Sequence, residues 1–298
     1  MLCCDTYASI GNCLINFYWN AFGPVNLVLD LAFADTFFLF IFINRKIQPV
    51  KASFTIVRQA ALGAVLLWVL AGLFVGGIIG FSLIARTFWT LFTAAIPLVL
   101  AFYAARTGKL ALLIAALMLA AFKYYGEVFE PNRLEVEQSV IAVKGIRKPV
   151  KIAHISDLQT DGLRAMHNDV LDAVNGYGPD LIFFTGDVMN HPSLETKIKA
   201  YLGGFKSRHG AFFVSGNVDQ LLNMREFFKG TGFEYLDRDY RTVKLEAGTI
   251  GVAGLGLDDF ADRPALEKIL VKMGKTDATL LLSHLPDALS TAAGLPVD

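Results

Sequence analysis

The chain has 298 residues, of which 54% are hydrophobic and 18% charged, and 27 basic side chains balance 27 acidic ones. Residues 1–130 hold only 8 Lys/Arg and 5 Asp/Glu, whereas residues 131–298 hold 19 and 22. This balance leaves no basic face large enough for the many phosphate contacts that nucleic acid requires, so no nucleic-acid partner is expected. The three cysteines all lie within the first 13 residues, so the rest of the chain has no disulfide framework.

Residues 1–126 are almost entirely apolar and are predicted to form a helical transmembrane region of three to four spans. The candidate spans, in chain order, are Val25–Ile43, Ala60–Ala85, Phe88–Ala105 and Leu110–Tyr125. The second of these has 26 residues without a charged side chain, and a span needs about 20. Gly72, Gly76 and Gly80, spaced four residues apart, suit close helix packing in lipid.

Two acidic residues lie inside the first candidate span. Asp30 and Asp35 are five residues apart, so they do not share one face of a helix. An ionisable residue within a span marks a functional site by default. A structural or peripheral role is preferred for these two residues, and a proton or ion path is the alternative.

The loop after the first candidate span is positively charged. It carries Arg45, Lys46, Lys51 and Arg58, and such loops lie on the cytoplasmic side of a membrane. Three spans counted from this loop place residues 127 onward outside. The C-terminal part is therefore expected to be extracytoplasmic.

Residues 135–298 are predicted to form a soluble α/β domain. Four apolar runs are typical of strands buried on both faces: Lys151–Ser156, Leu181–Thr185, Ala211–Ser215 and Thr279–Ser283. Further strand patterns occupy Val136–Val143 and a predicted hairpin of Thr242–Leu245 with Thr249–Gly254. Helical patterns occupy Leu163–Asn175, Ser193–Lys206, Leu221–Lys229 and Pro264–Met273. This alternation predicts a mixed, largely parallel sheet covered by helices.

Each of the four apolar runs is followed closely by a residue type that binds hard metal ions. These residues are Asp157, Asp187, Asn217 and His284. Because ligands gather outside the carboxyl ends of strands in open α/β sheets, we expect the four side chains to meet at one edge. Their oxygen and nitrogen atoms suit two divalent cations, and this indicates metal-assisted hydrolysis.

The same motifs carry a resemblance to a known family. In chain order they are His154-Ile-Ser-Asp157-Leu-Gln159, Gly186-Asp187, Gly216-Asn217-Val-Asp219 and Ser283-His284-Leu-Pro-Asp287. Together they resemble the calcineurin-like metallophosphoesterases, and Gly256-Leu-Asp258-Asp259 is similar to the membrane-associated bacterial branch of that family. The resemblance covers residues 135–298. It implies a metallophosphoesterase domain, a mixed β-sheet sandwich flanked by helices, that is incomplete at its C-terminus.

The resemblance also implies a role for each matching residue. Asp157 would ligate the first metal, Asp187 would bridge both, and Asn217 and His284 would ligate the second, so that Asp187 and Asn217 are the expected catalytic residues. Gln159 stands where the family usually has histidine and would coordinate through its amide oxygen. Two cations about 3.5–4 Å apart clamp the attacking and leaving oxygens and acidify a bridging water, which attacks as hydroxide.

The implied cofactors are two divalent ions from among manganese, magnesium, iron and zinc. Manganese is favoured, because Gln159 would add a neutral oxygen ligand. Two neighbouring residues have other expected roles. His154 lies inside the first strand and is expected to support the site by hydrogen bonding, and Asp219 either orients Asn217 or caps the following helix.

Two further departures from the family pattern bear on activity. Val218 replaces the histidine that usually follows Gly-Asn, so the group that assists the leaving oxygen is missing. This favours pyrophosphate-type bonds or activated diesters, whose leaving groups need little proton donation. The family would next supply a Gly-His-x-His block beyond Asp298, so the domain is expected to be truncated and this fragment poorly active.

The expected function is a phosphoesterase anchored in the bacterial inner membrane that hydrolyses phosphodiester, pyrophosphate or phosphomonoester bonds. The expected partners are the lipid bilayer and a phosphorylated substrate of lipid-linked or nucleotide type. One alternative is a degenerate phosphoesterase fold that serves as a membrane binding or scaffold module. Another is a transport function centred on Asp30 and Asp35.

Overall fold

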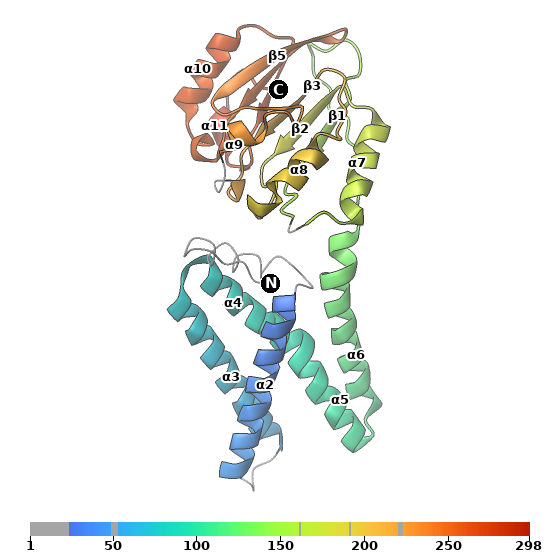
Figure 1. Cartoon of the computed structure of the whole chain (residues 1–298), viewed down its shortest axis with the longest axis vertical. Helices are drawn as coiled ribbons and strands as arrows, with labels where there is room; N and C mark the ends of the chain where they lie inside the picture. The colour runs from blue at the N-terminus through green and yellow to red at the C-terminus, as the bar shows by residue number, and fades with distance from the viewer. Residues whose placement is uncertain (1–23, 49–52, 161, 191, 220–222) are drawn as a thin grey trace. The chain divides into compact units, whose positions relative to one another are not determined.

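The computed structural model describes residues 24–48, 53–160, 162–190, 192–219 and 223–298. The chain divides into two compact units, Met1–Arg133 and Leu134–Asp298. Each unit is described by itself. Figure 1 shows that the first is made of helices and that the second contains all the described strands.

The first unit contains four stretches that are long and apolar enough to cross a membrane: Asn26–Ile47, Ser53–Val75, Leu83–Thr107 and Leu110–Asn132. Its α-helices are α2 (Pro24–Ile47), α3 (Ser53–Val75), α4 (Gly77–Thr90), α5 (Ile96–Thr107) and α6 (Leu110–Tyr124). The π-helical segment η1 (Leu91–Ala95) joins α4 to α5. The π-helical η2 (Tyr125–Phe129) and the 3₁₀ turn η3 (Glu130–Asn132) extend α6. The predicted three to four spans therefore correspond to four long apolar helical stretches.

One predicted span was placed wrongly. The run Ala60–Ala85 is not a single helix, because α3 ends at Val75 and Gly76 adopts a left-handed φ of 69° before α4 begins. The two helices then pack closely, and a Cβ on Gly80 would lie 2.1 Å from the Gly72 carbonyl oxygen. An uncharged apolar run conceals such a turn, since only the Gly76-Gly77 pair marks it in the sequence.

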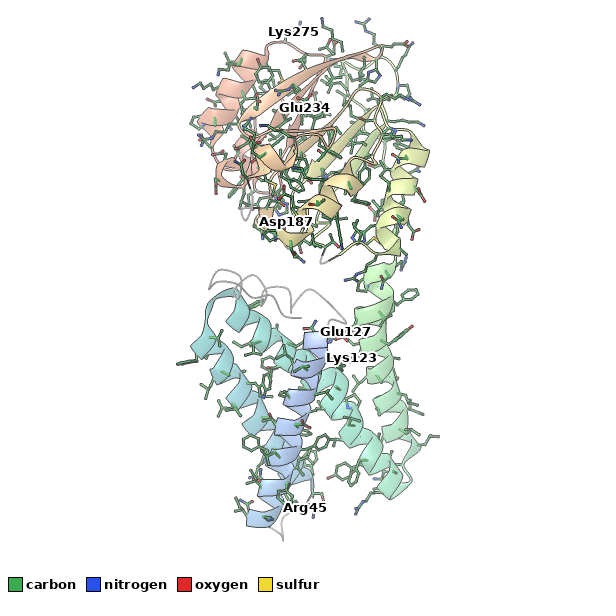
Figure 2. The ribbon with its side chains drawn as sticks, in the orientation of Figure 1. Arg45, Lys123, Glu127, Asp187, Glu234 and Lys275 are labelled. Atoms are coloured by element: carbon green, nitrogen blue, oxygen red, sulfur yellow. The ribbon has the colours of Figure 1, made fainter. Side chains whose placement is uncertain are left out.

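A buried network of ion pairs joins three helices of the first unit. The Arg86 guanidinium donates to both carboxylate oxygens of Asp30 at 2.8 and 2.6 Å, and it lies 2.8 Å from Glu127 Oε1. The Lys123 ammonium contacts Asp30 at 3.1 Å and Glu127 of η2, four residues further along the chain, at 2.8 Å. Figure 2 labels Lys123 and Glu127. The hydroxyl of Thr90 also donates to Asp30. Asp30 is therefore buried and ion-paired, and not peripheral.

The network lies beside both π-helical segments. η1 begins directly after Thr90, and Glu127 lies within η2. A π turn widens a helix locally, and such turns are frequent at functional sites. Asp35, by contrast, is exposed and takes no part in the network, as the five-residue spacing predicted.

The second unit contains two sheets. In the first, β1 (Ile152–Ile155), β2 (Leu181–Thr185), β3 (Gly210–Val214) and β4 (Phe233–Tyr235) are parallel and lie in that order. In the second, β6 (Gly248–Gly254) lies between β5 (Asp239–Leu245), to which it is antiparallel, and β7 (Ala278–Leu282), to which it is parallel. The predicted mixed sandwich and the predicted hairpin are confirmed.

Alternating side chains of the central strands form two separate cores. Leu181, Phe183 and Phe212 face the second sheet and pack with Ile250 and Val252. The side chains between them face the helices α7 (Ala165–Tyr177), α8 (Glu195–Leu202) and α9 (Met224–Phe227). Strands buried on both faces explain why these runs are apolar throughout.

The outer face of the second sheet is covered by the helix α10 (Arg263–Met273), next to β5 in Figure 1. The short helix α11 (Ala288–Ala292) follows β7. Leu266, Ile269 and Leu270 of α10 pack against Ala253 of β6. This burial fixes α10 along the edge strand β5.

Three strand and helix predictions need correction. The first strand was predicted to be buried on both faces, but β1 is the edge of its sheet and is only partly buried. The predicted strand Val136–Val143 is irregular and, apart from the half-buried Val143, exposed, without a strand partner among the described residues. The helix predicted at Leu221–Lys229 is reduced to Met224–Phe227, and its first two residues lie outside the described residues. β4 was not predicted, since three residues give too short a pattern.

Candidate metal centre

The carboxyl ends of four strands deliver polar side chains to one place. Asp157, Asp187 and His284 follow β1, β2 and β7, and each offers one ligand atom within 4.8 Å of the other two. Asn217 follows β3, and its Oδ1 lies 3.2 Å from His284 Nε2. The Gln159 amide donates to Asp187 Oδ2 at 2.6 Å. The structure thus brings together all five residues predicted as metal ligands.

The backbone at this rim is held in a left-handed conformation. Asp157, Gln159 and Asp187 have φ angles of 52°, 34° and 58°, which non-glycine residues rarely adopt. Two hydrogen bonds link the first and second loops: Asp157 N donates to Gly186 O at 3.1 Å, and Gln159 N donates to Asp187 O at 2.9 Å. Such strained positions cluster where side chains must be held for function.

Two glycines allow the loops to approach closely. Gly186 has a φ of 88°, and a Cβ there would lie 2.6 Å from His284 Nδ1. A Cβ on Gly216 would lie 2.2 Å from Asp187 Oδ1. Any larger residue at either position would push a site side chain out of place. The loops after β2, β3 and β7 therefore converge only because both residues lack a side chain.

The histidine ring is oriented by a backbone carbonyl. His284 Nδ1 lies 2.8 Å from Thr185 O, which can only accept, so Nδ1 carries the proton and Nε2 presents its lone pair. That lone pair faces Asn217 Oδ1 at 3.2 Å and Asp187 Oδ2 at 3.6 Å. Acceptor atoms that face one another need a cation between them. The donor set therefore fits a proton or a metal ion, and its mixture of carboxylate, amide and imidazole groups is typical of divalent metals.

Comparison with known proteins agrees with this geometry. Residues 150–294 match the model of the calcineurin-like phosphoesterase family. Residues 150–294 are a calcineurin-like phosphoesterase domain. The resemblance inferred from the motifs is thereby confirmed.

The relatives of this phosphoesterase domain are bacterial. An uncharacterized metallophosphoesterase of Campylobacter jejuni is 28% identical over 192 residues, which cover 58% of this chain and 48% of the relative. One from Helicobacter pylori is 26% identical over 186 residues, covering 56% and 48%. The uncharacterized metallophosphoesterase YkuE of Bacillus subtilis is 26% identical over 205 residues, covering 64% and 71%. The chain thus matches about half the length of the first two relatives.

Asp187 is the most enclosed acid of the candidate metal centre. It is 1% exposed, Val218 N donates to its Oδ1 at 2.8 Å, and Gln159 donates to its Oδ2. Both oxygens are therefore fixed in direction. The Asp157 carboxylate is exposed and accepts from Ser156 Oγ at 2.5 Å, so the two acids flank the site at different depths.

Asp219 has a role that neither sequence interpretation anticipated. Its buried carboxylate accepts from the backbone N–H groups of Asp187, Val188 and Gly216 at 2.7, 2.9 and 2.8 Å. It therefore ties the loop after β2 to the loop after β3. Burial raises the pKa of Asp219 to about 6, and the Asp187 charge acts in the same direction, while the three N–H groups oppose the shift. In the sequence, the available signal for this role was the position of Asp219 three residues after Gly216, a spacing at which an aspartate can accept from a backbone N–H in a turn.

The Gly256–Asp259 motif lies at the neighbouring part of the rim. Asp258 and Asp259 belong to the 3₁₀ turn η6 (Leu257–Asp259), which follows β6. Asp259 is buried and forms an ion pair with Arg238. Burial raises the pKa of the nearby Asp237, and the Asp259 charge raises it further. Asp259, the second aspartate of this motif, therefore fixes the position of the Arg238 side chain through an ion pair.

Gly216→Ala is expected to weaken manganese binding at least about tenfold, because the new Cβ displaces the Asp187 carboxylate. Manganese titration followed by electron paramagnetic resonance measures this affinity. Gly176→Ala is the matched control, since a Cβ there meets nothing within 4 Å and the residue lies in α7. The control is expected to raise the free energy of unfolding by about 0.5–1 kcal/mol. Equal manganese affinity in Gly216→Ala and wild type would contradict the expectation.

Proposed function

We propose that the chain is a membrane-anchored phosphoesterase that hydrolyses phosphate ester or anhydride bonds with two divalent cations. The observation that carries this proposal is the convergence of Asp157, Asp187 and His284 within 4.8 Å, in a domain of the phosphoesterase family. Asn217 and Gln159 complete the proposed ligand set, as their contacts with His284 and Asp187 suggest.

When bound, divalent cations supply positive charge for the phosphoryl oxygens and acidify the water that attacks. The chain's own residues set the geometry. Gln159 and His284 both face Asp187 Oδ2, so this carboxylate would hold the cations at the point where the proposed ligands meet. Asp219 fixes the backbone N–H groups around it. The Thr185 carbonyl holds the His284 ring with Nε2 towards the ligands.

We propose that the four apolar helices anchor the chain in a bacterial inner membrane. The α2–α3 turn follows Arg45 and Lys46, and the α5–α6 turn lies between Arg106 and Leu110. If each long stretch crosses once, both turns lie on one side, which the basic residues make the cytoplasmic side. The chain after Asn132 then emerges on the extracytoplasmic side. A substrate with a lipid-linked or nucleotide-type phosphate fits that location.

A panel assay tests the proposed activity. The full chain in detergent is incubated with manganese, bis(p-nitrophenyl) phosphate, nucleotide sugars, lipid phosphates and cyclic nucleotides. Release of product that depends on manganese and stops with EDTA is expected. Metal binding without turnover of any member would instead favour a binding or scaffold role.

Val218 predicts a preference among leaving groups. The residue is half-buried beside Asp187 and offers only its backbone N–H to the site, so no side chain there can protonate a leaving oxygen. Aryl and pyrophosphate-type substrates are expected to turn over at least about 100-fold faster than alkyl esters. Val218→His should raise alkyl turnover about tenfold or more, measured as kcat. Val271→His, at a position 81% exposed on α10, is the control. Equal turnover of alkyl and aryl diesters by the wild type would remove this argument.

A further inference from the structure

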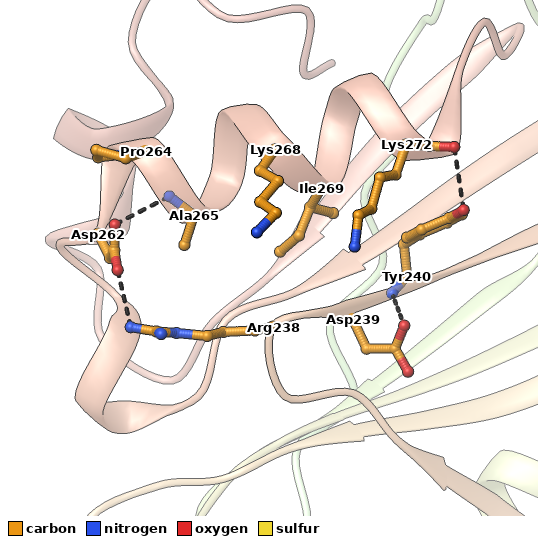
Figure 3. A pocket seen from close by; sticks show the side chains of 9 residues that line it. All are labelled: Arg238, Asp239, Tyr240, Asp262, Pro264, Ala265, Lys268, Ile269 and Lys272. Atoms are coloured by element: carbon orange, nitrogen blue, oxygen red, sulfur yellow. Dashed lines mark hydrogen bonds and ion pairs between the residues drawn. The ribbon is translucent and has the colours of Figure 1, made fainter.

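A groove of about 350 Å³ lies between the start of β5 and α10. Its walls include Arg238 and Tyr240 from the β5 side and Asp262, Lys268 and Lys272 from the α10 side (Figure 3). We call it the α10 groove. No residue proposed as a metal ligand lines it.

The lysines give the α10 groove an uncompensated positive charge. Lys268 and Lys272 are one turn apart, and Figure 3 shows both side chains pointing from α10 towards β5. Neither ammonium has an ion-pair partner within the described ranges. Two like charges one turn apart repel each other unless an anion lies between them.

The acidic residues of the groove are already engaged. Asp262 caps α10 by accepting from Ala265 N at 2.9 Å, and it binds Arg238 at 2.8 Å. Asp239 pairs with Arg241 at 3.1 Å. Neither carboxylate contacts a lysine of the groove. The lysine charge therefore remains available to a ligand.

Arg238 adds a guanidinium that is held in a fixed direction. Its backbone is left-handed, with a φ of 48°, and its Nη2 contacts both Asp259 and Asp262. The side chain is still 54% exposed, and its Nη1 and Nε atoms have no hydrogen-bond or ion-pair partner in the described part of the chain. A guanidinium held through Nη2 presents its other donors with little further loss of side-chain freedom.

The floor of the groove is apolar. Ile269 is 4% exposed, and the Tyr240 hydroxyl donates to Lys272 O at 3.0 Å, which fixes the ring against α10. Cationic walls over an apolar floor suit an anion carried on a small organic group. We propose that the α10 groove binds a phosphate monoester group through Lys268, Lys272 and Arg238. Both a soluble phosphate ester and a phosphatidic acid headgroup have this chemistry.

Lysine acetylation tests the site directly. The full chain in zwitterionic nanodiscs, with EDTA present, is treated with an acetylating ester while phenyl phosphate is titrated. Mass spectrometry then follows each lysine. Acetylation of Lys268 and Lys272 is expected to slow at least fivefold, and that of the exposed Lys197 and Lys206 should stay unchanged. Because EDTA removes divalent cations, this result does not depend on the proposed hydrolysis.

Variants complete the test. Calorimetry should show Lys268→Ala/Lys272→Ala weakening the affinity for phenyl phosphate at least tenfold, with Lys268→Arg/Lys272→Arg restoring it. Lys197→Ala/Lys206→Ala removes the same charge elsewhere and should have no effect. Nanodiscs with phosphatidic acid separate the two sources: protection without phenyl phosphate identifies a lipid headgroup, and protection by phenyl phosphate alone identifies a soluble ester. Equal protection of all four lysines, or unchanged affinity in Lys268→Ala/Lys272→Ala, would overturn the proposal.

Discussion

Asp187→Asn is expected to lower manganese-dependent hydrolysis by about 10³-fold or more, equivalent to about 4 kcal/mol in the activation barrier. The change keeps the size of the side chain and removes one negative charge from the point where the donors of the site converge. An amide cannot offset the repulsion of two dications. Its –NH₂ group would also face the Gln159 amide, which now donates to Asp187 Oδ2 at 2.6 Å.

The measurements are kcat/KM with bis(p-nitrophenyl) phosphate and the manganese content of the purified chain. Asp172→Asn is the matched control. It replaces the same acid by the same amide, and Asp172 is exposed on α7, away from the site. It should keep full activity and full metal content. If Asp187→Asn retained a tenth of the wild-type rate, the proposal that Asp187 bridges two cations would be contradicted.

The second large effect is expected in the helical unit. Arg86→Ala is predicted to lower the free energy of unfolding by about 3–5 kcal/mol, since it leaves Asp30 and Glu127 buried with one remaining cation, Lys123. Asp30→Ala should cost a similar amount. The double variant should cost clearly less than the sum, because neither charge is then left without its partner.

Unfolding in detergent, followed by tryptophan fluorescence, measures these differences. Arg106→Ala is the control: Arg106 is exposed near the end of α5, where its guanidinium lies 5.0 Å from the centre of the Phe102 ring. It should change stability by less than about 1 kcal/mol. Strict additivity of Arg86→Ala and Asp30→Ala would show that the two side chains do not interact.

The site was predictable from sequence because its signals are local. Asp187, Asn217 and His284 each follow an apolar run closely, and the rule for the carboxyl ends of strands brings such residues together. The sandwich also followed from local patterns, since β2 and β3 are apolar on both faces. The rule that ligands gather at the carboxyl ends of strands thus brought together four motifs that are distant in the sequence.

The features that the sequence concealed depend on pairing between distant segments. Arg86 meets Asp30 across 56 residues and Lys123 meets Asp30 across 93, and no spacing rule links them. The exposure of β1 depends on which strand lies at the edge of the sheet. The function of Asp219 is likewise non-local, because it binds the backbone of Asp187 across 32 residues.

The π-helical segment η1 has a consequence for how this helix tolerates insertions and deletions. A π turn is an α-helix with one residue inserted, and each residue of an α-helix turns by about 100°. Because the wider π turn takes up the additional residue locally, deleting one residue from Leu91–Ala95 would restore α-helical geometry with little rotation of α4 relative to α5. Arg86 would then keep its direction towards Asp30, so the network is expected to tolerate a one-residue deletion at η1.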